Sequence, residues 1–250
     1  MSPFTFLACT YNLWGDDRFG DNHWEERTQP LRQFLKVNRP DVLCPQELRP
    51  EACDLISSTL PLLHRIEDPF PGWTKEGNIF WNSELFELAD YGAEDIGLLD
   101  ENRRLFWVRL RTESGSTVVV STAHFSWIWE PGDLGEWVTV RVDEARATVV
   151  SLAELVTPDE PLLFMGDFND YLYPVDVLRN AGFEDSFRAL GRVPMTTYPA
   201  RSGSGEPPTL LDWMMHRGPI RPTLTSVVDF FVNEIPPSDH KPILTTYTTP

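Results

Sequence analysis

Short apolar runs that each end at a polar residue recur along this chain, and no other sequence feature constrains its fold as strongly. The first run, Phe4 to Tyr11, is typical of a buried strand that ends at Asn12. Apolar residues then recur at helical spacing between Glu25 and Val37, until Pro40 stops the pattern. Because another apolar run, Val42 to Cys44, follows at once, this segment predicts a strand, a helix and a second strand.

The later apolar segments continue this alternation. Residues 141–155 have helical periodicity, whereas the remaining runs are typical of strands: 78–81, 105–110, 118–123, 162–165, 210–215 and 243–247. A Glu-Ser-Gly-Ser turn separates 105–110 from 118–123, which indicates an antiparallel hairpin. Hairpin and crossover connections together favour an α/β (α+β) fold, with a mixed sheet or two packed sheets flanked by helices.

Length and charge limit the organisation and the partners of the chain. Sandwiches of about this length, 250 residues, commonly form one domain, and we find no internal repeat or long linker, so we expect a single domain over 1–250. The 21 basic and 38 acidic residues give a net charge of -17, which disfavours non-specific binding to nucleic acid. Bound divalent cations can still reverse the field inside one cleft, so a phosphate substrate is not excluded.

The cysteines and the N-terminal segment bear on the compartment. Three cysteines, Cys9, Cys44 and Cys53, lack the paired spacing of zinc sites or disulfide frameworks, which is typical of buried thiols in a reducing compartment. The first residues lack a basic region, and no apolar stretch is long enough to cross a bilayer. We therefore expect a cytoplasmic monomer with no transmembrane segment.

The strongest chemical motif is Gly166-Asp167-Phe168-Asn169, directly after an apolar run. Gly166 permits a sharp exit from the strand, and Asp167 and Asn169 point the same way in extended chain. Asp167 is suited to orienting and deprotonating water, and Asn169 to holding a phosphoryl oxygen. An Asx turn, in which these side chains only cap the backbone, is an equally good explanation of the motif alone.

A second motif, Ser238-Asp239-His240, precedes the last strand. Asp239 offers an oxygen ligand for a hard cation, and His240 titrates near physiological pH. Asp212 lies inside an apolar run, where an unpaired carboxylate would be costly to bury, so it requires a partner. We expect that partner to be His240, whose tautomer and basicity the carboxylate would fix.

Other polar residues stand at strand ends. Glu47 would supply a second oxygen ligand, and Asn12 would either orient Glu47 or contact the metal. His124 follows the strand at 118–123, and Glu76 precedes the one at 78–81, so they could form a second carboxylate–histidine pair. Each of the four also has a plain structural explanation as a strand-end polar residue.

In chain order, these residues resemble the motif series of the endonuclease/exonuclease/phosphatase superfamily. The segments that carry the resemblance span nearly the whole chain: Asn12, Gln46-Glu47, His124, Gly166-Asp167-Phe168-Asn169, Leu211-Asp212-Trp213 and Ser238-Asp239-His240. The resemblance implies a DNase I-like four-layer α/β sandwich, two packed mixed β-sheets flanked by helices. It also implies Mg²⁺-dependent attack of water on phosphorus, with Mn²⁺ or Ca²⁺ as substitute ions.

The resemblance further implies roles at the metal and the phosphate. Glu47 would bind the metal, and Asn12 and Asp239 would help shape its site. Asp167 and Asn169 would position the nucleophile and the phosphate.

Two histidines complete the site implied by the resemblance. His240, held by Asp212, would stabilise the transition state or act as the base, and Asp167 is the alternative base. His124, supported by Glu76 as in pancreatic-type deoxyribonucleases, would protonate the leaving oxygen.

Substrate choice is less well defined by the sequence. Trp127, Trp129 and Trp137 follow His124 and are suited either to stacking on a planar group of the substrate or to packing a long loop. The basic residues Arg103, Arg104 and Arg141 could contact flanking phosphates or lie on a solvated face. We favour a phosphodiesterase or nuclease acting on a nucleic acid, a nucleotide or another small phosphodiester.

Two alternatives remain open at this stage. The first is another phosphoesterase, either a phosphomonoesterase or a sphingomyelinase-type enzyme. The second is a non-catalytic binding module that has kept the fold, although the intact set of acids, amides and histidines weighs against it.

Overall fold

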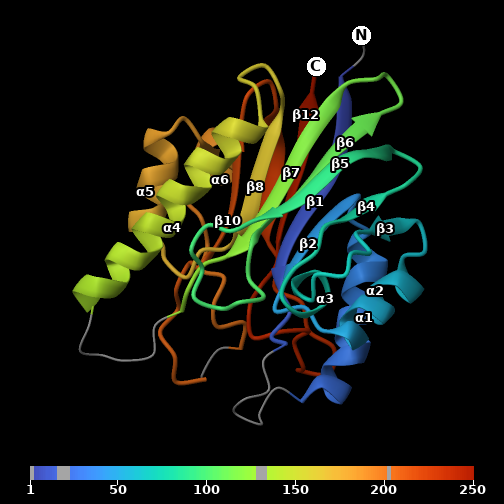
Figure 1. Cartoon of the computed structure of the whole chain (residues 1–250). Helices are drawn as coiled ribbons and strands as arrows, with labels where there is room; N and C mark the ends of the chain where they lie inside the picture. Colours follow the sequence, from blue (N-terminus) through green and yellow to red (C-terminus); the bar gives the residue numbers. More distant parts are fainter. Residues whose placement is uncertain (1–2, 16–22, 128–133, 202–203) are drawn as a thin grey trace.

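The computed structural model describes residues 3–15, 23–127, 134–201 and 204–250, with the backbone alone at 134–139. In this part of the chain the strands form two six-stranded sheets (Figure 1). The first sheet has the spatial order β11 (Arg221–Val227), β12 (Ile243–Thr249), β1 (Phe4–Asn12), β2 (Val42–Gln46), β4 (Phe80–Asn82) and β3 (Leu63–Arg65). The second has the order β5 (Phe86–Glu94), β6 (Leu105–Thr112), β7 (Thr117–His124), β8 (Leu162–Asp167), β10 (Asp212–Arg217) and β9 (Glu184–Asp185).

Both sheets are mixed. In the first, β1 runs parallel to β2 and antiparallel to β12. In the second, β8 runs parallel to β7 and antiparallel to β10. The predicted hairpin of β6 and β7 is confirmed as an antiparallel pair.

The apolar core between the sheets follows from the two-residue period of the strands. Alternate side chains of each strand face inward, so Ala8 and Cys44 of the first sheet share one buried cluster with Val120, Met165 and Met214 of the second. Each large apolar side chain contributes about 1.5–3 kcal/mol when fully buried. Because a shift of one residue would turn every inward side chain outward, this burial fixes the register of the strands.

Helices cover the outer face of each sheet and make four layers in all (Figure 1). On the first sheet, Phe34 of the covering helix contacts Tyr11, with ring centroids 5.2 Å apart. On the second, Leu152 and Leu178 share a buried cluster with Phe164. The main covering helices are α1 (Trp24–Asn38) and α2 (Pro50–Thr59) on the first sheet, and α4 (Leu134–Leu155) and α5 (Tyr173–Asn180) on the second. The predicted fold class is therefore confirmed.

The end of α1 illustrates how the sequence sets an element boundary. Pro40 disfavours helical geometry in the residue before it. Arg39 leaves the helical conformation as a left-handed cap, with φ at 45°, while its N–H donates to Leu35 O at 2.9 Å. The helix thus closes before the proline and β2 can begin.

Some elements were not predicted from the sequence. β5 lies at the edge of its sheet with mostly exposed or half-buried side chains, so it lacks the apolar alternation of a half-buried strand. The other missed elements are α2, α5, β11 and the short segments β3, β9, α3 (Gly72–Lys75) and α6 (Ser186–Ala189). The helix predicted over 141–155 begins earlier, at Leu134.

Two further expectations concern the thiols and the membrane. The three cysteines are free and buried, as predicted. Among the helices of the described residues, none combines the length and the apolar character that crossing a membrane requires.

Candidate active site

The candidate site lies where the core between the two sheets changes from apolar to polar side chains. In the second sheet, His124 of β7 and Asp212 of β10 both pair in register with Asp167 of β8. In the first sheet, Asn12 pairs with Gln46. Residues paired across neighbouring strands project from the same face of a sheet, so the inward-facing rows that form the core end in these polar groups.

Gln46 joins the two sheets beneath the site. Its side-chain amide Nε2 donates to Thr122 Oγ1 of the opposite sheet at 3.0 Å and to Cys44 O at 2.8 Å. A third acceptor, Thr10 Oγ1, lies 3.2 Å from the same nitrogen, so this buried amide is held by both sheets. Gln46 therefore fixes the spacing between the strand ends that carry the site.

Asp167 is the point on which the site residues converge. Asn12 Nδ2 donates to Asp167 Oδ2 and to Glu47 Oε1, at 3.0 Å in each case. The Nε2 atoms of His124 and His240 lie 3.6 and 3.7 Å from the same Oδ2 atom. The structure thus brings together five residues that the sequence singled out separately.

Close backbone contact at Gly166 explains why this motif carries a glycine. A Cβ atom at that position would lie 2.0 Å from the backbone oxygen of Ala123, on the neighbouring strand. Only glycine permits this approach without moving β7 or β8. This close approach of β7 and β8 keeps Asp167 in register with His124.

Asn169 is oriented by two hydrogen bonds. Its backbone N–H donates to Asp167 Oδ1 at 2.8 Å, and its Nδ2 donates to Phe125 O at 2.8 Å. Its φ of 50° lies in the left-handed region, which asparagine tolerates better than most residues. The Asx-type turn considered from the sequence is therefore present, and it places the amide beside the carboxylate.

His240 forms the predicted pair with Asp212. Its Nδ1 donates to Asp212 Oδ2 at 2.8 Å, and both side chains are buried. Burial by itself lowers the pKa of His240, but the charges of Asp212 and Asp167 outweigh it and leave the pKa well above its usual value. Thr197 supports the pair, since its Oγ1 accepts a hydrogen bond from the backbone N–H of Asp212 at 3.1 Å.

His124 has a different environment. Its Nδ1 lies 3.7 Å from Glu76 Oε2 and, among the described residues, has no hydrogen-bond partner. Arg103 Nε instead donates to that Glu76 oxygen at 3.0 Å. Burial, with a further contribution from the charge of Arg103, lowers the pKa of His124 to about 4. His124 is therefore neutral at pH 7 in this state of the site.

Glu47, Asn12 and Asp239 provide oxygen-rich surroundings that suit a divalent cation. Burial, and then the charge of Glu47, raise the pKa of Asp239 to about 6 against the opposing effect of His240. A hard cation with oxygen ligands would stabilise the charged form of a carboxylate in such surroundings. Asn12 Oδ1 accepts a hydrogen bond from the backbone N–H of Trp14 at 2.9 Å. In this conformation Asn12 orients Glu47 through its Nδ2 atom.

A second group of possible ligand atoms belongs to Asp167, Asp212 and His240, which offer atoms within 4.8 Å of one another. However, a cation there would compete with the hydrogen bond between His240 and Asp212. Glu47 and Asp239 are both carboxylates, and a hard cation prefers their oxygens to the imidazole nitrogen that the second group would use. We therefore regard Glu47 and Asp239 as the better metal ligands.

Other candidates from the sequence have structural partners. Arg141 donates to Asp170 Oδ2 from Nε at 3.2 Å and is buried. Arg104 donates to backbone carbonyl groups. Trp127 is 49% exposed beside the site, whereas Trp129 and the side chain of Trp137 lie outside the described residues.

Arg27 is a positioning residue that the sequence analysis missed. Its guanidinium donates to Leu13 O at 2.9 Å and to Pro237 O at 2.7 Å, which ties the segment after β1 to the segment that carries Asp239. Burial lowers its pKa to about 10, so it keeps its charge at neutral pH. The spacing of Arg27 from Leu31 and Phe34 placed it on the apolar face of α1 and could have indicated a buried, paired role.

The fold and the clustered side chains define the class of protein: a DNase I-like α/β sandwich with acids, amides and imidazoles at one end of the interface between its sheets. The model of the Endonuclease/Exonuclease/phosphatase family matches residues 9–240, and the chain belongs to that family. Its members are phosphoester hydrolases. The resemblance stated from the sequence motifs is thereby confirmed.

Solved structures agree with this assignment. The TDP2 of D. rerio, solved with a single-strand DNA product, is 18% identical, covers 98% of this chain and 99% of its own, and has a TM-score of 0.80. An endonuclease/exonuclease/phosphatase from Bacteroides vulgatus is 17% identical, with coverage of 99% and 100% and a TM-score of 0.82. A mannosyl-6-phosphatase from Bacteroides thetaiotaomicron is 18% identical, with coverage of 96% and 98% and a TM-score of 0.78. No curated protein sequence gives a significant match. At these identities the likeness shows the fold and does not name the substrate.

Proposed function

We propose that this protein is a divalent-metal-dependent phosphodiesterase that uses water to cleave a phosphoester bond. The proposal rests on the surroundings of Asp167: the amide of Asn12 and the imidazoles of His124 and His240 all lie next to its carboxylate. The same Asn12 amide also donates to Glu47. A carboxylate flanked in this way can orient a nucleophile and surround a phosphoryl group with hydrogen-bond donors. A structural role alone does not require two buried histidines on one carboxylate oxygen.

Asp167 and Asn169 act on the nucleophile and the phosphate. Asp167 orients the attacking water and is one of two candidates to accept its proton. Because Asn169 is fixed through both its backbone and its side chain, its amide is positioned to hold a phosphoryl oxygen without further ordering.

His240 and His124 act from opposite sides of the reacting group. His240 carries a positive charge, held by Asp212, and is suited to stabilising the negative charge that develops on the phosphoryl oxygens. That role leaves Asp167 as the preferred base. His124 is neutral before substrate binds, and the negative charge of a bound phosphoester would raise its pKa, so that it could protonate the leaving oxygen.

Glu47 and Asp239 would hold the metal ion, with Asn12 orienting Glu47. The bound ion, Mg²⁺ or in its place Mn²⁺ or Ca²⁺, would polarise the phosphoester and offset its charge. This local positive charge is what an acidic protein needs in order to bind an anionic substrate.

A substrate panel tests the proposal. We expect hydrolysis of bis-nitrophenyl phosphate in Mg²⁺ or Mn²⁺ that EDTA abolishes, with slower hydrolysis of mononitrophenyl phosphate. Single-stranded and duplex DNA, RNA and sphingomyelin then separate the substrate classes. Asp143→Asn, at an exposed carboxylate of α4 that pairs with Arg146, is the control variant and should behave as the wild type.

The same panel distinguishes the alternatives. Preference for the monoester would make the protein a phosphomonoesterase, and preference for sphingomyelin a sphingomyelinase-type enzyme. If no phosphoester were hydrolysed with any of the three metal ions, the chain would be better described as a binding module that retains the fold.

A further inference from the structure

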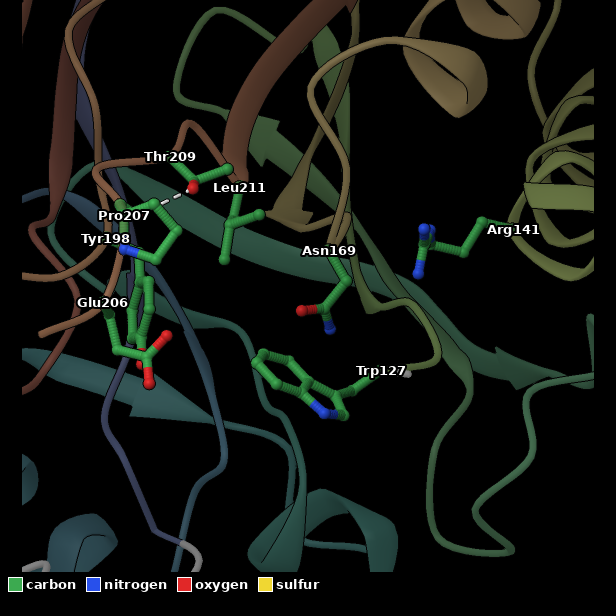
Figure 2. A pocket seen from close by; sticks show the side chains of 8 residues that line it. All are labelled: Trp127, Arg141, Asn169, Tyr198, Glu206, Pro207, Thr209 and Leu211. Atoms are coloured by element: carbon green, nitrogen blue, oxygen red, sulfur yellow. Dashed lines mark hydrogen bonds between the residues drawn. The ribbon is translucent and has the colours of Figure 1, made fainter. Parts of the chain in front are cut away.

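A cavity of about 230 Å³ lies directly beside the proposed reaction centre (Figure 2). Figure 2 shows Tyr198 and Glu206 on one side of it, Trp127 and Asn169 on the other, and Arg141 further along. These residues come from four separate parts of the chain, and none of them belongs to the proposed metal site. The cavity is smaller than the roughly 300–1,000 Å³ typical of pockets for drug-sized ligands, so it has room for about one ring.

Two of the lining residues connect the cavity to the catalytic groups. The ring of Tyr198 lies 5.0 Å from the ring of His240, centroid to centroid. Asn169 donates its backbone N–H to Asp167. A group attached to the reacting phosphorus would therefore reach the cavity through a short link.

Buried charged side chains hold one wall of the cavity in place. Arg141 donates to Asp170 Oδ2 and also to Ser126 O, at 3.4 Å. On its other side, the Ser126 N–H donates to Glu144 Oε2 at 3.0 Å. The residue immediately before Trp127 is thus fixed by two partners, so the position of Trp127 at the cavity edge is organised before a ligand binds.

The charges around the cavity indicate what it can accept. The guanidinium of Arg141 is compensated by Asp170, 3.2 Å away, and Glu206 adds an exposed negative charge on the opposite side. A second phosphate would be repelled there, whereas a hydroxyl or amino group can donate to Glu206. Trp127 and Tyr198 present aromatic faces on which a sugar or a base can stack.

We propose that this cavity selects the substrate by binding one uncharged ring that bears hydrogen-bond donors, either a sugar or a nucleobase, linked to the scissile phosphate. This inference rests on the proposed function and extends it to the substrate class. Glu206 accepts the hydrogen bonds of the ring, and Trp127 and Tyr198 contact its faces.

The test uses p-nitrophenyl phosphodiesters that share the leaving group and differ only in the second ester group. The probes carry a methyl group, a cyclohexylmethyl group, glucose attached through O6, or thymidine attached through O5′. We expect kcat/KM to be at least about tenfold higher for the glucose or thymidine ester than for the methyl and cyclohexylmethyl esters. Whichever of the two is preferred identifies the ring as a sugar or a nucleoside.

Variants of the lining residues test the mechanism of selection. Glu206→Gln should reduce the preference for the donor-bearing ring by about tenfold, mainly through KM, and leave the methyl ester unchanged. Trp127→Leu should weaken all ring-bearing probes by a similar factor. The matched controls are Glu154→Gln on α4 and Tyr91→Leu on β5, both exposed and outside the cavity lining, and they should leave the ratios unaltered.

The outcomes separate this inference from the proposed function. Equal kcat/KM for the methyl and the donor-bearing esters, or ratios unaffected by Glu206→Gln and Trp127→Leu, would overturn the cavity assignment while hydrolysis stands. If no probe were hydrolysed, calorimetric titration with glucose 6-phosphate, thymidine 5′-phosphate and inorganic phosphate would still decide it. Binding no tighter for the ring-bearing phosphates than for inorganic phosphate would then reject the cavity as a ring site.

Discussion

The two histidines on either side of Asp167 have similar positions and opposite charge states. Their Nε2 atoms lie 3.6 and 3.7 Å from the same carboxylate oxygen, and both side chains are buried. Each also has a second acid beside its Nδ1 atom. Even so, the pKa of His240 lies well above its usual value, and that of His124 is lowered to about 4.

The difference depends on where the second acid directs its charge. Asp212 forms a hydrogen bond of 2.8 Å with His240. Glu76 lies 3.7 Å from His124 and is already bound by Arg103, whose positive charge lies close to the imidazole. At His240 the neighbouring acids outweigh the effect of burial on the pKa, whereas at His124 burial and the charge of Arg103 outweigh the neighbouring acids.

Asp167→Asn removes the group that both histidines share, and we expect the largest effect from it. Turnover should fall by about 10³-fold or more, within the range for losing a general base together with its positioning role. The measurement is kcat on bis-nitrophenyl phosphate, with circular dichroism to show that the variant is folded. Near-normal turnover in folded Asp167→Asn would remove this carboxylate from the mechanism.

His124→Asn tests whether burial keeps His124 neutral, and the quantity measured is the free energy of unfolding. The folded pKa of His124, about 4, lies below its ordinary value of 6.5. Its contribution is therefore complete above pH 6.5 and is lost as the pH falls toward 4. Between those limits the wild type should lose about 3 kcal/mol of unfolding free energy relative to the variant.

Urea unfolding of the wild type and His124→Asn at pH 7 and pH 4.5 measures this loss. The control is His64→Asn, at an exposed histidine of β3, which should follow the wild type at both pH values. Parallel pH dependence in the wild type and His124→Asn would mean that His124 is not held neutral by burial.

Asp212→Asn tests whether Asp212 maintains the positive charge of His240. An asparagine cannot stabilise the imidazolium, so the pKa of His240 should fall and turnover should drop by about 10²-fold. Titration of the histidine resonances by NMR and kcat on bis-nitrophenyl phosphate give the two readouts. An unchanged His240 titration would show that Asp167 alone maintains its charge.

Arg103→Gln should bring the pKa of His124 closer to that of His240. We expect the smallest effect on turnover from this variant. Removing the guanidinium removes a positive charge that lowers the pKa of His124, so this pKa should rise by about one unit. We expect the histidine titration and the acidic limb of the pH–rate profile to move upward, with turnover changed by no more than about tenfold. Arg111→Gln, on β6, the strand that follows the loop of Arg103, is the control because its side chain is 48% exposed. An equal shift in both variants would argue against a local effect.

The sequence predicts best those features that depend on periodicity within one segment. Short continuous apolar runs placed the strands that end at Asp167 and His124, because central strands of a layered fold are buried on both faces. The cost of an unpaired carboxylate inside an apolar strand also predicted a partner for Asp212. The pairing with His240 that the structure contains is the one we expected.

Features that depend on contacts between distant segments could not be predicted in this way. Glu76 looked suited to His124 because both stand next to strands, but the competing Arg103 comes from a loop whose path has no periodic pattern. Asn12 likewise has two carboxylates within reach only because Gln46 and Thr122 hold the two sheets at a fixed spacing. The cavity beside Asn169 is lined largely by loop residues, and its only sign in the sequence was the group of tryptophans that follows His124.

His124, Asp167 and Asp212 pair across three adjacent strands, so the geometry of the reaction centre depends on the register of these strands. A slip of one residue in β8 would turn Asp167 away from both neighbours. It would also exchange the apolar row that packs between the sheets with the row that packs under the helices, because both faces of β8 are buried. Misaligned molecules would therefore be inactive and unstable together, and catalytic activity would report on correct folding of the sheet. The loops that line the cavity lie beyond these strand ends, so they could change the choice of substrate without disturbing that alignment.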